Sequence, residues 1–126
     1  MPTELAQGKT GLAMLLFRDD FTEKDYDPKE LFERFMAWAE KLENSGKLVA
    51  ANPLGQGGKT VRRRGAGIVV DGPYAEGREA VLGYFIVRVA SFEEALAIAE
   101  ECPHSQVGGA TEVRELKDFP FGALRA

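Results

Sequence analysis

The sequence is poor in the residues that most often form cross-links or carry catalysis. Its 126 residues include one cysteine, one histidine and one tryptophan. The single cysteine, Cys102, cannot form a disulfide within the chain, and nothing near it in sequence would lower the pKa of its thiol. We therefore expect Cys102 to be a small buried apolar side chain rather than a reactive thiol.

The sequence also lacks an excess of basic residues and has no long apolar run. The net charge is −4, which disfavours a nucleic-acid or anionic-membrane surface. No segment reaches the roughly 18 apolar residues that cross a bilayer, and the first residues lack the cationic and then apolar pattern of a secretory leader. We expect a cytoplasmic protein with neither a nucleic-acid nor a membrane partner.

One local exception is the basic run of residues 62–64, which follows Lys59 beside a glycine-rich segment. Three consecutive arginines could hold a phosphate group, but they are fewer than a nucleic-acid surface needs. We interpret them as the solvated tip of a hairpin.

The composition, with 44% hydrophobic and 29% charged residues, is that of a single globular domain. The apolar run of residues 11–17 predicts a strand. Asp27, Pro28 and Glu30 then form the capping signature of a helix that ends at Gly46. We place on its core side the apolar residues at helical spacing, namely Leu31, Phe32, Phe35, Met36, Ala39 and Leu42. Trp38, at the edge of this stripe, is interpreted as packing rather than as a ligand platform.

The second half of the chain repeats the pattern of a strand, a helix and a strand. We expect a strand at 47–51, a hairpin of 59–64 and 67–71, a strand at 82–89, a helix from Ser91 to a stop at Pro103, and a final strand at 110–116. Two such helices pack on one face of an antiparallel sheet. The fold class is therefore α+β, a ferredoxin-like sheet with an inserted hairpin, over residues 11–117 between a loose lead-in (1–10) and a tail (118–126).

Alternation along residues 82–89 separates two faces of the sheet. Gly83, Phe85, Val87 and Val89 fall on the side of the helices. The opposite face receives apolar residues with no helix to cover them, namely Leu12, Met14, Leu16, Tyr84 and Ile86. Because exposing such a patch is unfavourable, we predict a homodimer through this open face.

A short motif connects the chain with a known family. The segment Asp71-Gly72-Pro73-Tyr74-Ala75-Glu76, followed by Leu82-Gly83-Tyr84-Phe85, resembles the D-G-P-F-A-E…G-G-Y-Y signature of the DGPF branch of the YCII-related family. The resemblance covers about residues 11–117 and implies a dimeric α+β barrel. Tyr74 stands where the family usually has phenylalanine, and Gly77-Arg78-Glu79 replaces the usual Thr-Lys-Glu or Ser-Lys-Glu.

The resemblance does not supply a complete catalytic pair. Smaller YCII-like relatives are credited with a histidine on the N-terminal strand that pairs with an aspartate, and residues 11–17 contain no histidine. His104 is the best candidate for acid–base work, although a histidine after a helix can also hydrogen-bond the last carbonyls. Asp71 is its candidate partner, and the alternative is that Asp71 only bonds amides of its own turn.

Five further residues are candidates for ligand binding. They are Tyr74, Glu76, Tyr84, Arg88 and Arg114, and surface ion pairs are the alternative for the two arginines. No metal-spaced cluster or nucleotide-binding loop is present in the sequence, so we expect neither a cofactor nor a metal.

Two classes of function remain open. One is a small-molecule binding protein or cofactor-independent enzyme of isomerase or lyase type, with a cleft near the Asp-Gly-Pro-Tyr turn. The alternative is a non-catalytic dimeric module with a regulatory or scaffolding role.

Overall fold

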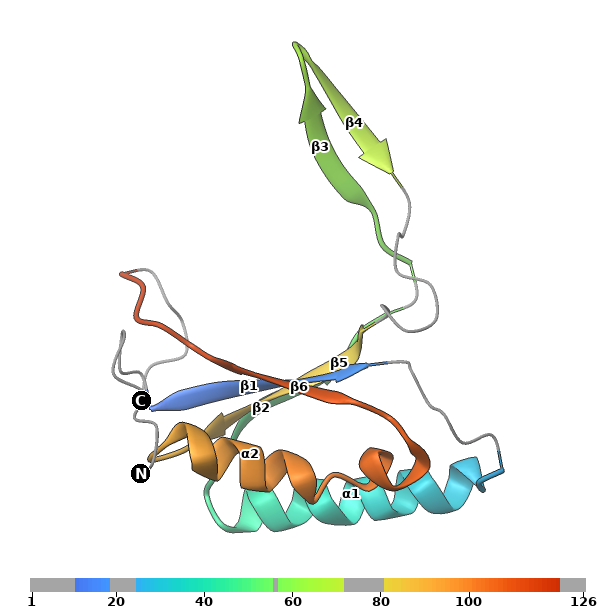
Figure 1. Ribbon diagram of the computed structural model, residues 1–126, viewed down its shortest axis with the longest axis vertical. Coiled ribbons are helices and arrows are strands. Elements are labelled where there is room, and N and C mark those ends of the chain that lie inside the picture. The colour runs from blue at the N-terminus through green and yellow to red at the C-terminus, as the bar shows by residue number, and fades with distance from the viewer. Residues whose placement is uncertain (1–10, 19–24, 56, 72–80, 121–126) are drawn as a thin grey trace.

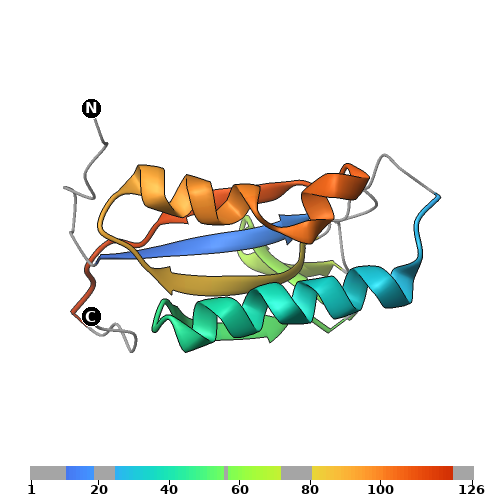
Figure 2. The ribbon, with the colours of Figure 1, turned by 90° about the horizontal axis from the view of Figure 1, so that it is seen from below.

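The computed structural model describes residues 11–18, 25–55, 57–71 and 81–120. Its main sheet is antiparallel and has the strand order β2-β5-β1-β6. These strands are Leu12–Arg18 (β1), Leu48–Pro53 (β2), Val81–Arg88 (β5) and Thr111–Glu115 (β6). Helices α1 (Pro28–Asn44) and α2 (Phe92–Glu100) lie side by side on one face of this sheet (Figures 1 and 2). The predicted ferredoxin-like α+β arrangement is therefore confirmed.

Two further elements complete the fold. A separate two-stranded sheet consists of β3 (Thr60–Arg64) and β4 (Gly67–Asp71), and it stands away from the body on the side opposite the helices (Figure 1). A short 3-10 helix, η2 (Pro103–Val107), follows α2 and contacts α1. The sequence predicted the hairpin, whereas it indicated only a connection where η2 forms. Among the described residues, no helix is long and apolar enough to cross a membrane.

Helix α1 begins where its capping residues predict. The Asp27 carboxylate accepts a hydrogen bond from the Lys29 amide at 3.0 Å, and Pro28 occupies the first helical position, where no amide hydrogen is needed. Gly46, with φ of 75°, follows the end of the helix in the left-handed conformation that glycine adopts most readily.

The expected core side of α1 is wrong for two residues. Phe32 and Met36 are 62% and 50% exposed. The inward stripe instead runs through Leu31, Trp38 and Leu42, and Phe32 and Met36 each lie one residue, about 100° of helical rotation, past an inward position.

The core lies between the helices and the sheet and is rich in aromatic rings. Trp38 is 6% exposed and stacks on Phe85 with ring centroids 5.2 Å apart, so its interpretation as packing is confirmed. Phe17 contacts Phe85 edge to face at 5.0 Å. Cys102 is fully buried in the same cluster, as predicted, and burial raises the pKa of its thiol.

The open face of the sheet is less exposed than expected. Cα pairing of Met14 with Ile86 and of Leu16 with Tyr84 confirms that these residues share that face. Leu12 and Ile86, however, are 0% and 3% exposed. The other three apolar residues of this face are half-buried.

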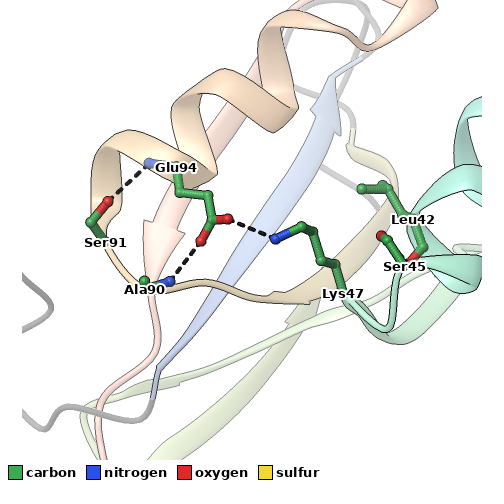
Figure 3. Close-up of polar contacts among 6 residues, drawn as sticks. All are labelled: Leu42, Ser45, Lys47, Ala90, Ser91 and Glu94. Atoms are coloured by element: carbon green, nitrogen blue, oxygen red, sulfur yellow. Dashed lines mark hydrogen bonds and ion pairs between the residues drawn. The ribbon is translucent and has the colours of Figure 1, made fainter.

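The start of α2 is held by a polar cluster (Figure 3). Ser91 caps the helix by accepting a hydrogen bond from the Glu94 amide at 3.2 Å, while the Glu94 carboxylate accepts from the Ala90 amide at 2.7 Å. The Lys47 ammonium donates to the same carboxylate at 2.7 Å. Lys47 and the Ala90 amide hold the pKa of Glu94 below its ordinary value. This cluster ties the turn after α1 to the beginning of α2.

Candidate functional site

A cavity of about 610 Å³ opens between α1 and one end of the sheet. Its walls come from the first half of α1, the end of β2 and the beginning of β5. Most lining residues are apolar, and the residues on which the chemistry depends are Phe17, Phe35, Asn52, Tyr84 and His104. The sequence analysis placed a cleft near the Asp-Gly-Pro-Tyr turn, whereas this cavity lies between the sheet and a helix. Its strand wall, Leu82 to Phe85, follows the Asp71 motif closely in sequence.

The backbone around His104 is fixed by the short helix η2. Pro103 starts η2 directly after the extended Cys102, and Gly108, with φ of 81°, ends it. The carbonyl oxygen of His104 accepts a hydrogen bond from the Gly109 amide at 2.8 Å. Proline at the start and a left-handed glycine at the end therefore set the direction in which the imidazole projects.

The imidazole of His104 lies among aromatic rings. It stacks on Phe35, with ring centroids 4.9 Å apart and an angle of 19° between the planes, and meets Phe17 edge to face at 5.9 Å. Burial lowers the pKa of His104 below its ordinary 6.5, because the cationic form loses hydration there. His104 is thus mainly neutral at pH 7, with one ring nitrogen that can accept a proton and one that can donate.

A second polar group in the cavity wall comes from two facing strands. Asn52 of β2 and Tyr84 of β5 are direct neighbours in the sheet, and the Asn52 amide donates to the Tyr84 hydroxyl at 3.0 Å. Both residues line the cavity. A phenol that accepts one hydrogen bond can donate its own proton to another oxygen. Tyr84, a predicted ligand-binding residue, therefore borders the same cavity as His104, but alternation along β5 directs its side chain to the open face of the sheet, opposite the helices.

Gly83 permits close contact between the two strands at this wall. A Cβ atom at this position would lie 2.8 Å from the carbonyl oxygen of Asn52 and 3.0 Å from the Cα atom of Pro53. Both are backbone atoms and cannot rotate away. Steric contact with the neighbouring strand thus explains why the Leu82-Gly83-Tyr84-Phe85 motif has glycine at this position, which the sequence alone does not reveal.

The two predicted arginines lie outside this cavity. Arg88 is exposed at the far end of β5, where it pairs opposite Leu12. Arg114 of β6 is exposed and contacts Glu112 at 3.1 Å, and Arg18 contacts the same carboxylate at 2.8 Å. Arg114 first and then Arg18 lower the pKa of Glu112. Arg114 therefore forms the surface ion pair named as the alternative.

Of the acidic residues of the motif, only the backbone of Asp71 belongs to the described part of the chain. Asp71 is the last residue of β4, with its backbone opposite Thr60. β4 stands on the open side of the sheet, whereas η2 with His104 lies on the helix side (Figure 1). The side chain of Asp71, as well as Tyr74 and Glu76, lies outside the described residues.

Sequence reasoning missed the contribution of Phe17, Phe35 and Asn52. The two phenylalanines were expected in the core, where their rings do pack, but they also form the wall against which His104 rests. Asn52 follows the expected strand of residues 47–51 but lies within β2. An available signal was the nearness of both Phe17 and Asn52 to the ends of predicted strands, where sites form.

Comparison with known proteins places the chain in a family. The family model of the YCII-related domain matches residues 14–120. The chain belongs to the YCII-related domain family. It is 33% identical over 122 residues to the uncharacterized protein R00369 of Rhizobium meliloti (strain 1021), covering 89% of this chain and 96% of that protein.

One similar solved structure is 5-chloro-2-hydroxyhydroquinone dehydrochlorinase (TftG) from Burkholderia phenoliruptrix AC1100, in complex with 2,5-dihydroxybenzoquinone. The TM-score is 0.43 and the sequence identity is 22%, over 83% of this chain and 93% of that chain.

Proposed function

We propose that this YCII-related chain binds a small, mostly apolar ring compound in the cavity beside α1, and that His104 exchanges a proton with it. The reaction class is cofactor-independent isomerisation or elimination. The observation that carries the proposal is the imidazole of His104, held between aromatic rings in the wall of a cavity of about 610 Å³. This volume is within the range of roughly 300–1,000 Å³ that is typical of small-molecule sites.

The lining of the cavity selects the kind of ligand. Apolar and aromatic side chains dominate it, and the imidazole of His104 contributes a polar side chain. A strongly charged ligand would lose hydration there without a matching partner among the described lining residues. A planar ring with one or two hydroxyl or carbonyl groups can stack on the aromatic side chains and bond to the polar ones.

His104 supplies the acid–base chemistry. Since burial lowers its pKa, the imidazole is already in the basic form at neutral pH and can remove a proton without first losing one. The imidazolium that forms can return the proton to another atom of the same ligand, which completes an isomerisation, or to a leaving group, which completes an elimination.

Ligand binding can be tested with a panel of hydroxylated and carbonyl-bearing ring compounds and, for contrast, linear dicarboxylates. We expect ring compounds to raise the melting temperature and to shift the imidazole NMR signals of His104, which is the sole histidine. His104→Asn should retain binding and lose turnover of a ligand that is converted. If turnover survives in this variant, the acid–base role is wrong.

A matched pair of variants shows whether binding occurs in this cavity. Phe35→Leu removes the ring that stacks on His104, whereas Phe92→Leu makes the same change at another half-buried position beside the core, outside the cavity lining. We expect only Phe35→Leu to weaken binding. Equal effects would place the ligand elsewhere, and no binding of any ring compound would favour the non-catalytic module.

A further inference from the structure

The β3–β4 hairpin, residues 59–71, is here called the arm. Figure 1 shows it projecting from the body on the open side of the sheet, away from both helices. Two-stranded hairpins are marginally stable in water unless a further surface packs on them. The arm therefore needs a contact beyond its own two strands.

One face of the arm is apolar and exposed. The strand register pairs Val61 with Val70 and Arg63 with Ile68, and these four residues share a face because side chains alternate along a strand. Val61, Ile68 and Val70 are 66%, 59% and 57% exposed. Three large exposed apolar side chains on so small an element form a contact surface, and the charged side chain of Arg63 lies at one end of it.

The arm and the rest of the chain carry opposite charges. Residues 59–71 contain four basic residues and one acidic residue, a net charge of +3. The whole chain has a net charge of −4, so the remainder carries −7. A surface formed by another copy of this chain is thus electrostatically complementary to the arm, whereas polyanions such as nucleic acid would be repelled by the remainder.

Helix α1 presents a matching surface, here called the α1 stripe, formed by Phe32, Met36 and Glu40. These residues are spaced four apart, so they lie along one side of the helix, and all three are exposed. One helical turn of about 5.4–6 Å separates Met36 from Glu40. On the arm, about 6.8 Å separates Val61 from Arg63. Both surfaces therefore pass from apolar to charged over a similar distance and end in opposite charges.

For the homodimer expected from the sequence, with open sheet faces toward each other, we propose that the arm of each copy docks on the α1 stripe of the other. The arm and α1 of one chain lie on opposite sides of the sheet (Figure 1), so the stripe it covers belongs to a second copy. Strands of five residues are about 17 Å long, which exceeds the roughly 10 Å between stacked sheets. The arm can thus extend beyond the plane of the partner sheet, toward its helix layer.

This arrangement gives the second copy a part in the candidate site. Phe32 and Met36 line the cavity as well as the exposed side of α1. An arm docked on them covers the cavity wall that they form, so the enclosed site is completed only in the dimer. The inference concerns association and holds whether or not the cavity binds a ligand.

Charge reversal followed by mixing tests the proposal in the full-length protein. Arg63→Glu and Glu40→Arg each place like charges together in a homodimer, and we expect the dimer dissociation constant of each variant to rise by about tenfold or more. In a mixed dimer of the two variants both contacts again join opposite charges. Analytical ultracentrifugation should therefore show a dimer in the equimolar mixture at concentrations where either variant alone is monomeric.

Several results would overturn the proposal. One is a wild-type protein that is monomeric at concentrations near 100 μM, and another is a pair of variants that dimerise as tightly as the wild type. A third is an equimolar mixture that remains monomeric. Any of these would mean that the arm contacts its own chain or a different partner. The control Glu100→Arg makes the same charge change on an exposed residue of α2 and should leave dimerisation unchanged. A ligand-binding assay on the same samples keeps failure of the site distinct from failure of the dimer.

Cross-linking provides a second readout that does not depend on charge. Met36→Cys combined with Val70→Cys should give, on mild oxidation, a covalent dimer on a denaturing gel. Leu96→Cys combined with Val70→Cys uses an exposed apolar position on the other helix and should stay a monomer. An intrachain product from the first pair, or equal cross-linking of both pairs, contradicts docking on the α1 stripe of a second copy.

Discussion

The side chain of His104 shows how a single environment sets both the reactivity of a residue and its effect on stability. Folding moves the imidazole from water to a position between Phe35 and Phe17, and burial lowers its pKa below 6.5. The folded state therefore binds fewer protons than the unfolded state once the pH falls below the unfolded pKa. Stability should decline as the pH decreases from about 6.5 toward the folded pKa.

Titration of the imidazole NMR signals between pH 4 and 8 measures this pKa directly, because no other histidine contributes. We expect a midpoint below 6.5 in the wild type and a midpoint closer to 6.5 in Phe35→Leu, which admits water to the ring. In His104→Asn the loss of stability that begins near pH 6.5 should vanish. A wild-type midpoint at or above 6.5 would show that the ring is hydrated or faces a carboxylate.

Gly83 permits a test of strand spacing in the cavity wall. Gly83→Ala places a methyl group against the backbone of Asn52 and Pro53, and neither neighbour can move without displacing β2 from β5. We expect a loss of about 1–3 kcal/mol in the free energy of unfolding, measured by urea denaturation. Gly58→Ala, where nothing lies within 4 Å of the added atom, is the matched control and should change stability much less.

How much of the site the sequence could predict depends on the kind of contact involved. His104 could be predicted as a site residue because it is a lone histidine after a helix, and Tyr84 because it belongs to a motif. Phe35 and Asn52 could not be predicted, since their roles depend on which strand and helix ends meet in space. Residue type suggests chemistry, but convergence of residues far apart in the chain requires the tertiary fold.

At the scale of elements, helix starts were the most predictable feature. Asp27 and Ser91 cap α1 and α2 through local hydrogen bonds that depend only on neighbouring residues. The burial of individual helix residues was less predictable, as Phe32 and Met36 show. An apolar pattern defines a wide stripe, and the packing of α1 against the sheet decides which part of that stripe is covered. η2 was missed because five residues are too short for a periodic signal.

The cluster at the start of α2 gives a prediction at this scale. Glu94→Gln removes a charge that accepts hydrogen bonds from Lys47 and from the Ala90 amide, so we expect a loss of about 0.5–1.5 kcal/mol at pH 7. Because folding lowers the pKa of Glu94, its contribution is complete above the unfolded value near 4.5 and is lost as the pH falls through the folded pKa.

Thermal unfolding of Glu94→Gln and wild type at several pH values checks this sign. The difference in stability should be largest near pH 7 and should shrink below pH 4. Glu100→Gln, an exposed carboxylate at the other end of the same helix, serves as the control and should alter stability little at any pH. A difference that does not depend on pH would mean that the carboxylate charge contributes nothing.

At the scale of the whole molecule, the sequence indicated a homodimer for a reason that the structure modifies. Leu12 and Ile86 of the open face are already buried within one chain. The most exposed apolar side chains of the sheet elements lie instead on the arm, and those of α1 lie at the cavity. The proposed docking of the arm would therefore cover apolar surface that a contact between sheets alone would leave in water.

Salt should separate the electrostatic from the apolar part of this association. The arm carries a net charge of +3 and the rest of the chain −7, so attraction between a basic arm and an acidic partner surface should weaken when salt screens it. Raising the NaCl concentration from about 0.05 M to about 0.5 M shortens the Debye length from roughly 14 Å to roughly 4 Å. We expect the dimer dissociation constant, measured by sedimentation, to rise over this range.

In Arg63→Glu the dissociation constant should rise less with NaCl concentration, or should fall, because added salt then screens repulsion at that contact. A wild-type dimer that tightens with NaCl would show that apolar burial alone holds the two copies together, and the charges of the arm would then need a different explanation.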